Sequence, residues 1–242
     1  MAALEAGCDL VGGAPYMDRD AHGQIGRIFA IARRFDVGID FHLDNTLDGD
    51  GLDALEVCRM TEAAGWGGRV AIGHATKLST LAPADLEVVG RRLAAAGVSV
   101  AVLPATDLFI MGAGLTENVP RGVAPAHRLR AAGVTCSLST NNVLNPFTPF
   151  GDGSLLRIAN LFANVAQVGD TEGLAGCFEM ISTEAGRALG RDCAVVVGGT
   201  ADLVMWDCGS PAQAVAEIAP AVMGWKRGRL AFERAGVRLM PP

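Results

Sequence analysis

"TEAAGWGGRVAIGHATK" (Thr61–Lys77) contains the pattern that decides the fold. It begins as the end of a helix, turns at Gly65 and continues as a short apolar strand. Glycine at that position is typical of a helix C-terminus, because glycine adopts the left-handed conformation without a steric penalty. The strand ends in polar residues, His74 and Thr76. The stretch therefore predicts one helix–turn–strand unit with a polar end.

The same unit occurs in four other stretches of the chain. They are "LEAGCDLVGGAPY" (4–16), "ARRFDVGIDFHLDN" (32–45), "LAAAGVSVAVLPATD" (93–107) and "LRAAGVTCSLSTNN" (129–142). Their strands are near-continuous apolar runs, which is typical of parallel strands covered on both faces. Amphipathic segments over Gly51–Gly65 and Pro83–Gly97 predict helices between the strands. Successive strand–helix units with right-handed crossovers predict an α/β protein.

Polar side chains stand at the end of every predicted strand. They are Tyr16, His42, Asp44, Asn45, His74, Thr76, Thr106, Asp107, Asn141 and Asn142. A single residue of this kind would more often cap a strand or the following helix. Five consecutive polar strand ends favour a functional site, since active sites of α/β proteins lie at the carboxyl ends of parallel strands.

The pattern changes after Gly151. "GSLLRIANLFANVAQVG" (153–169) and "LAGCFEMISTEAGRALG" (174–190) predict amphipathic helices. "GGTADLVMWDC" (198–208) predicts a strand, and "VMGWKRGRLAFERAG" (222–236) predicts a hairpin that turns at Arg227-Gly228. We expect a partial barrel with C-terminal helices over residues 1–192 and the strands of a small β-domain over residues 193–242.

The composition excludes several classes of protein. The 242 residues have a net charge of -6 and no Lys/Arg run, which argues against nucleic acid as a partner. No apolar stretch approaches the roughly 18 residues that cross a bilayer, and "MAALEAGCDL" lacks the basic segment of a secretion signal. Six scattered cysteines without a CxxC pair indicate a reduced, cytoplasmic protein. The PCxxC signature of base-flipping zinc deaminases is absent as well.

Two of the four histidines, His42 and His74, follow neighbouring predicted strands at equivalent positions. Such a pair suits a divalent metal with nitrogen and oxygen ligands and an open position for water. The spacing is equally compatible with core or substrate-contacting histidines. We expect His22 in a loop and His127 on a helix to be ordinary surface residues.

Five segments in this order resemble the amidohydrolase superfamily, most closely its cytosine deaminase-like branch. They are "DFHLDN", "IGHAT", "TNNVLNPFTPFGDG", "MISTEAGRALG" and "GGTADLVMWD", and they span nearly the whole chain. The two histidine strands and "NPFTPFGDG" are the most specific pieces. The resemblance implies a TIM-type (β/α)8 barrel with a divalent metal, zinc or iron. It also implies hydrolysis of a non-peptide C–N bond in a small cyclic amide, amidine or nitrogen heterocycle.

The resemblance also implies roles for individual residues. His42 and His74 match metal ligands of the fifth and sixth barrel strands. Asn141 matches an aspartate that is both a metal contact and a general base, and Asn45 matches a proton-shuttling carboxylate. Asn142, Thr76 and Asp107 are the expected substrate contacts.

The chain departs from the family pattern at its amino end, because it contains no HxH motif. Its strands resemble about five C-terminal βα units, so the first strands of the barrel are missing. An open five-stranded sheet would expose two apolar edges, which natural proteins avoid. We therefore expect either a longer protein, in which Met1 is an internal start, or a homo-oligomer.

The asparagines are the second departure. A neutral amide cannot take a proton from water, and general-base assistance is worth roughly 10²–10⁴ in rate. A non-catalytic barrel fragment or pseudoenzyme that binds a small molecule or a partner chain is therefore the alternative hypothesis. Asp44 should point away from the site by strand alternation, and Asp107 could instead cap a short helix. A dinucleotide-binding protein is disfavoured, because "GAGLTEN" (112–118) is not a GxGxxG motif.

Overall fold

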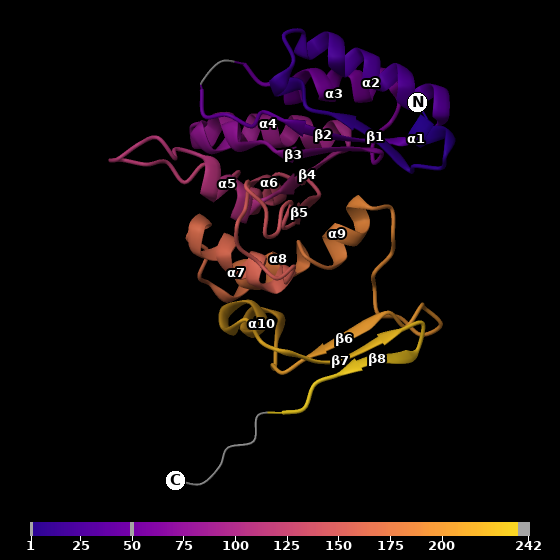
Figure 1. Ribbon diagram of the computed structural model, residues 1–242, viewed down its shortest axis with the longest axis vertical. Helices are drawn as coiled ribbons and strands as arrows, with labels where there is room; N and C mark the ends of the chain where they lie inside the picture. The colour runs from indigo at the N-terminus through magenta and orange to yellow at the C-terminus, as the bar shows by residue number, and fades with distance from the viewer. Residues whose placement is uncertain (1, 49–50, 237–242) are drawn as a thin grey trace.

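A computed structural model describes residues 2–48 and 51–236 of the chain (Figure 1). Its main sheet has five parallel strands in the spatial order β1-β2-β3-β4-β5, the same as their order in the chain. The strands are β1 (Leu10–Gly13), β2 (Gly38–Leu43), β3 (Val70–His74), β4 (Val98–Val102) and β5 (Cys136–Leu138). The prediction of a partial α/β barrel with about five βα units is confirmed.

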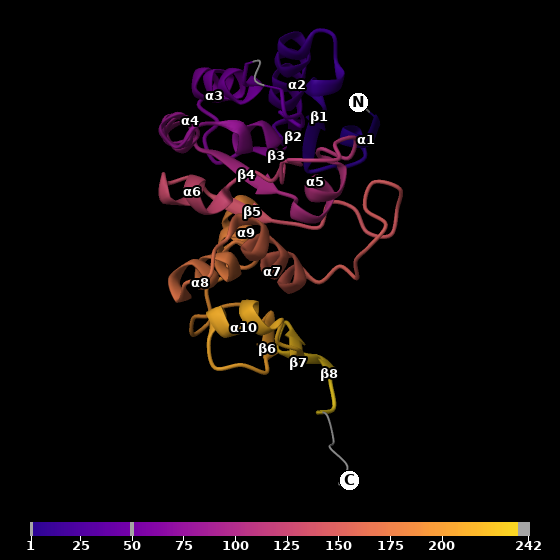
Figure 2. The ribbon, with the colours of Figure 1, turned by 90° about the vertical axis from the view of Figure 1, so that its left-hand side faces the viewer.

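The helices of the repeating units pack on one face of this sheet (Figure 2). They are α2 (Ala21–Phe35), α3 (Asp53–Ala64), α4 (Pro83–Ala96) and α6 (Ala126–Ala131). Short helical segments precede and connect the strands: α1 (Ala2–Glu5), η1 (Pro15–Met17), η2 (Thr76–Thr80) and α5 (Pro104–Ile110). Gly65 and Gly97 end α3 and α4 in the left-handed conformation, with φ of 66° and 67°. Both helices lie where the sequence predicted them.

The sheet face under the helices forms the hydrophobic core. Phe41, Ile72, Val100 and Cys136 are aligned by register across β2, β3, β4 and β5, and all four side chains are buried. Burial of a large apolar side chain contributes about 1.5–3 kcal/mol, so such rows hold the strands in register.

The opposite, concave face differs from the expectation of strands covered on both faces. Residues there alternate with the core residues and are small or polar: His42, Gly73, Ala101 and Ser137 form one register row. The helices α2, α3, α4 and α6 lie on the other side of the sheet (Figure 2). The residues that follow His42 along this register row are therefore small, at the place where the sequence predicted a site.

The two edges of the sheet are not equivalent. On β5 the backbone N–H of Leu138 donates to the Met180 carbonyl at 3.0 Å, and that of Cys136 donates to the Glu184 carboxylate at 3.2 Å. Residues 180–184 thus cap the β5 edge, which corrects the expectation of two exposed edges. The outer side of β1 has no such partner within residues 2–48 and 51–236.

The C-terminal part begins with helices α7 (Leu155–Ala166), α8 (Thr171–Glu179) and α9 (Thr183–Ala188). The single helix expected over residues 174–190 is therefore split into α8 and α9. Three antiparallel strands follow, β6 (Leu203–Trp206), β7 (Ala221–Lys226) and β8 (Arg229–Glu233), with the hairpin turning at Arg227-Gly228 as predicted. The sequence reading missed helix α10 (Pro211–Glu217), which packs against α8 and α7 (Figure 1). Within the described ranges no helix combines the length and apolarity needed to cross a membrane.

Candidate active site

His42 and His74 lie side by side at the carboxyl ends of the adjacent strands β2 and β3. The Nδ1 atom of His42 is 3.0 Å from the Nε2 atom of His74, and the ring centroids are 4.8 Å apart. His74 is 3 % exposed and His42 is half-buried. The predicted proximity of the two imidazoles is confirmed.

A strained turn brings His74 to its neighbour. By strand alternation Gly73, rather than His74, would share the concave face with His42, because Gly73 and His42 are register partners. His74 instead has φ of 69°, and the N–H of Ala75 donates across it to the Gly73 carbonyl at 3.0 Å. Such a three-residue turn is rare for a residue with a side chain, and strain of this kind clusters at functional sites.

Asp107 holds the other side of the His74 ring. Its Oδ1 atom is 2.6 Å from His74 Nδ1, and its side chain, in the first turn of α5, is fully buried. The carboxylate accepts the Nδ1 proton, which leaves the Nε2 lone pair of His74 directed at His42. Burial raises the pKa of Asp107, while its hydrogen bond to His74 works in the opposite direction. Within the described residues the Asp107 carboxylate bonds His74 and no backbone N–H of α5, so it does not cap that helix, and its expected substrate contact stays a prediction.

The surroundings of His42 favour the neutral form of its imidazole ring. Burial lowers its pKa, and so does the neighbouring His74. The sequence reading missed Asp40, which stands two residues earlier on the same concave face of β2 and whose pKa is raised by burial. The period of two along a strand was the signal that could have found it.

Two imidazole nitrogens that face each other suit a divalent transition metal. No group of three His, Cys, Asp or Glu side chains within residues 2–48 and 51–236 is arranged to hold a metal ion. His42 and His74 therefore fit as part of a ligand set that needs further ligands.

Thr76 and Asp44 are structural supports of the site. The Thr76 hydroxyl is fully buried and donates to the carbonyls of Asp44 and Thr46, at 3.1 and 3.0 Å. The substrate contact expected of Thr76 stays a prediction. The Asp44 carboxylate accepts the N–H groups of Asp53 and Ala54 at the start of α3, both at 3.0 Å, and burial raises its pKa to about 6. Asp44 thus points away from His42, as alternation predicted.

The two asparagines expected at catalytic positions have different surroundings. Asn45 is 9 % exposed, and its Oδ1 atom is buried without a hydrogen-bond partner among the described residues. Asn141 is exposed and has φ of 58°, and the N–H of Asn142 donates across it to the Thr140 carbonyl at 2.8 Å. Asn141 therefore occupies the same kind of turn as His74. In the described part of the chain no hydrogen bond joins Asn141 to either histidine.

The loop after β5 carries a network that the sequence reading did not anticipate. Asn145 Nδ2 donates to Asn142 Oδ1 at 2.6 Å, and Asn145 Oδ1 accepts the N–H groups of Phe147 and Thr148. The Thr148 hydroxyl bonds that of Thr106 at 2.6 Å, with both side chains buried. Thr106 directly precedes Asp107, so this loop is fastened beside the residue that orients His74. Hydrogen bonds within a loop leave no periodic signal in a sequence.

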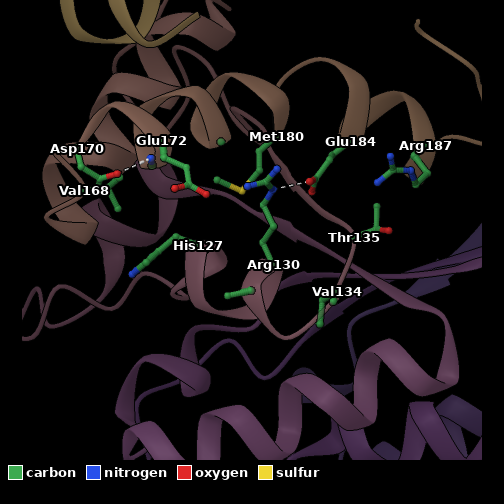
Figure 3. Close-up of a pocket in the computed structure, with 14 residues that line it drawn as sticks. His127, Arg130, Val134, Thr135, Val168, Asp170, Glu172, Met180, Glu184 and Arg187 are labelled. Atoms are coloured by element: carbon green, nitrogen blue, oxygen red, sulfur yellow. Dashed lines mark hydrogen bonds and ion pairs between the residues drawn. The ribbon is translucent and has the colours of Figure 1, made fainter.

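A cavity of about 620 Å³ lies elsewhere, between α6, α8, α9 and the residues that precede β5 (Figure 3). It is at the amino end of the strand, opposite to the polar strand ends. Arg130 in its wall is bound by Glu179 and Glu184, and Asp170 accepts the Gly173 N–H at the start of α8. These charges are committed to the fold, so the candidate active site remains at the histidine pair.

Comparisons with known proteins identify the family of this chain. The model of the amidohydrolase family matches residues 2–232. A pterin deaminase of Rhizobium rhizogenes is 29% identical over 210 residues, which are 84% of this chain and 46% of that protein. The chain thus spans about half the length of the curated relatives it matches.

Solved structures share the fold. A 5-methylcytosine deaminase from Klebsiella pneumoniae superposes with a TM-score of 0.90 at 22% identity, over 100% of this chain and 60% of that one. A zinc-bound adenosine deaminase from Xanthomonas campestris gives 0.64 at 20% identity, over 90% of this chain and 50% of that one. With the family model matching nearly its whole length, the chain belongs to the amidohydrolase family.

Proposed function

We propose that the chain is the C-terminal part of the barrel of a metal-dependent amidohydrolase that hydrolyses a C–N bond of a small nitrogen heterocycle. The observation that carries the proposal is the line of contacts Asp107–His74–His42 at the carboxyl ends of adjacent strands. The relatives support the substrate class, since a pterin deaminase and a 5-methylcytosine deaminase act on such rings.

In this proposal His42 and His74 are two ligands of a divalent ion, zinc or iron. When bound, the ion supplies a Lewis acid that polarises the scissile bond and makes water more acidic. His74 offers Nε2 because Asp107 holds the proton on Nδ1. His42 offers Nδ1 once the single proton of its ring has left that nitrogen, and its lowered pKa keeps the ring neutral near neutral pH.

Asn141 and Asn45 stand where the family has carboxylates, so the proposed hydrolysis lacks a general base at these two positions. Neither amide can accept a proton at neutral pH, so they orient substrate or water and do not act as bases. A chain that binds heterocycles without turnover, the pseudoenzyme alternative, would follow if no other group moves the proton. We assign that role to Asp40, a carboxylate on the same face of β2 as His42.

The test is ammonia release from pterin and 5-methylcytosine by the purified chain loaded with Zn²⁺ or Fe²⁺. We expect turnover that is lost in His74→Ala and retained in His127→Ala, because His127 lies on α6 away from the strand ends. Equal turnover in the metal-free wild type and in His74→Ala would reject the hydrolase proposal. Binding of these rings without turnover by the metal-loaded wild type would favour the pseudoenzyme.

A further inference from the structure

The cavity of about 620 Å³ beside α8 and α9 is lined by two charged side chains that the fold does not use. Glu172 lies in the first turn of α8 and Arg187 in the last turn of α9, and both are exposed at the cavity. Among residues 2–48 and 51–236 neither side chain has a hydrogen-bond or ion-pair partner. One carboxylate and one guanidinium are therefore available to a ligand.

Arg130 lies between these two charges (Figure 3). Its Nε and Nη2 atoms donate to Glu184 and Glu179, while Nη1 donates to no acceptor in the part of the chain that the structure describes. Gly176 leaves room for Nη1, because a Cβ at that position would lie 2.8 Å from it. Two carboxylates already balance the charge of Arg130, so its remaining N–H groups suit a neutral acceptor such as a peptide carbonyl.

The separation of the two charges follows from the helices that carry them. Glu172 precedes Gly176 by four residues in α8, and Arg187 follows Glu184 by three residues in α9. Residues at these spacings share one face of a helix and lie about one turn, roughly 5.4 Å, apart. One turn on each side of Arg130 places the two charges roughly 10 Å apart. An extended peptide rises about 3.3–3.6 Å per residue, so about three residues bridge this separation.

The rest of the wall suits the body of such a peptide. Val134, Val168 and Met180 supply apolar surface. The volume falls within the range of roughly 300–1,000 Å³ that is typical of ligand sites. Arg187 also lines a second hollow of about 190 Å³, which leaves space for a side chain beside a bound carboxyl group.

We propose that this cavity binds a short zwitterionic peptide, an apolar tripeptide with both termini free. Its ammonium group pairs with Glu172, its carboxylate pairs with Arg187, and one of its backbone carbonyls accepts a hydrogen bond from Nη1 of Arg130. Two opposite charges at a set separation select the ligand by its length as well as its charge. The site lies at the amino end of β5 and uses neither His42 nor His74, so it is independent of the proposed hydrolysis.

The probes are the tripeptide Leu-Ala-Leu, its N-acetylated form and its C-terminal amide. Each derivative lacks one of the two terminal charges. Dissociation constants are measured by calorimetry in the presence of chelator, so that metal occupancy and turnover do not enter. Because both partner side chains are exposed, loss of either charge should weaken binding to wild type about two- to fivefold.

Two substitutions assign each end of the peptide to its partner. Glu172→Gln should lose the preference over the acetylated peptide and keep the preference over the amide, and Arg187→Gln should do the reverse. Glu117→Gln and Arg33→Gln, at exposed positions outside the cavity, are the matched controls and should keep both preferences. Thermal midpoints equal to that of wild type show that the variants fold.

Equal affinity of wild type for the three peptides, or binding of none of them, would overturn the proposal. So would folded Glu172→Gln and Arg187→Gln variants that keep both preferences. A wild-type preference over the amide alone would identify the C-terminal tail of a protein as the ligand and would overturn the zwitterion. His74→Ala should bind all three peptides as wild type does, which separates this site from the hydrolase proposal.

Discussion

The Nε2 atom of His74 lies 3.0 Å from the Nδ1 atom of His42, while the opposite nitrogen of the His74 ring is held by the buried Asp107 carboxylate at 2.6 Å. This line of three side chains spans β2, β3 and the start of α5. Asp107 fixes the tautomer of His74, so that the lone pair on Nε2 of His74 faces Nδ1 of His42. The proposed metal binding by His42 and His74 depends on this arrangement.

Removal of the Asp107 charge should weaken metal binding without removing a ligand. In Asp107→Asn the amide no longer favours a proton on His74 Nδ1, so the affinity for Zn²⁺ should fall about 10–100-fold. Calorimetric titration measures this affinity. Asp85→Asn, at an exposed position of α4, is the control and should match wild type. Equal affinities for all three proteins would remove Asp107 from the site.

Restoring a carboxylate at Asn141 should increase both metal affinity and turnover. Aspartate tolerates the left-handed conformation at φ of 58° as asparagine does, so Asn141→Asp should keep the turn after β5. A general base at this position would raise kcat by about 10²-fold or more. Steady-state ammonia release measures it, with Asn164→Asp as a charge-matched control. A variant that folds but shows no gain would place Asn141 away from the reacting bond.

The two glutamates that bind Arg130, in α8 and α9, should contribute differently to the stability of the protein. Arg130 binds both Glu179 and Glu184, but the Glu184 side chain is 8% exposed and also accepts the Cys136 N–H, whereas Glu179 is 47% exposed. Glu184→Ala leaves the buried Cys136 N–H without its acceptor and should cost about 1–3 kcal/mol. Glu179→Ala should cost about 1 kcal/mol or less. Urea unfolding measures both, and equal losses would contradict the proposed cap of β5.

The rate at which each cysteine thiol is alkylated at a given pH tests whether it is buried as the structure describes. Burial raises the pKa of Cys58 and of Cys177 to about 11, and raises that of Cys136 as well. At pH 9 a thiol with a pKa near 11 is only about 1% thiolate, the reactive form. Iodoacetamide at pH 9 should therefore label the exposed Cys8 and Cys193 in the native protein. Labelling of the three buried thiols should require urea, and rapid native labelling of Cys136 would show that β5 is not packed as described.

Much of the main sheet was predictable because its signals are local. Apolar runs bounded by glycine caps mark β3 and β4, and the polar residues after each strand mark the correct end of the sheet. His42 and His74 could be predicted to lie close together because they end two adjacent parallel strands, although their register positions differ by one residue. The hairpin at Arg227-Gly228 was equally local.

The remaining features depend on contacts that a pattern does not encode. His74 and Asn141 have positive φ although neither is glycine. The local sequence therefore contains no signal for the turns that orient their side chains. The role of Asp107 requires packing of α5 against a strand that lies far earlier in the chain. Helix α10 is short, begins with proline and is stabilised by its packing on α8, a tertiary effect that local propensity does not capture.

The most direct test of the central claim is a titration of the metal-free chain with Co²⁺, followed by the absorption bands of the bound ion. The account predicts that His42 and His74 bind one equivalent together, so His42→Ala and His74→Ala should each abolish the bands while His127→Ala retains them. Bands of equal intensity in all four proteins, or none in the wild type at saturating Co²⁺, would contradict it.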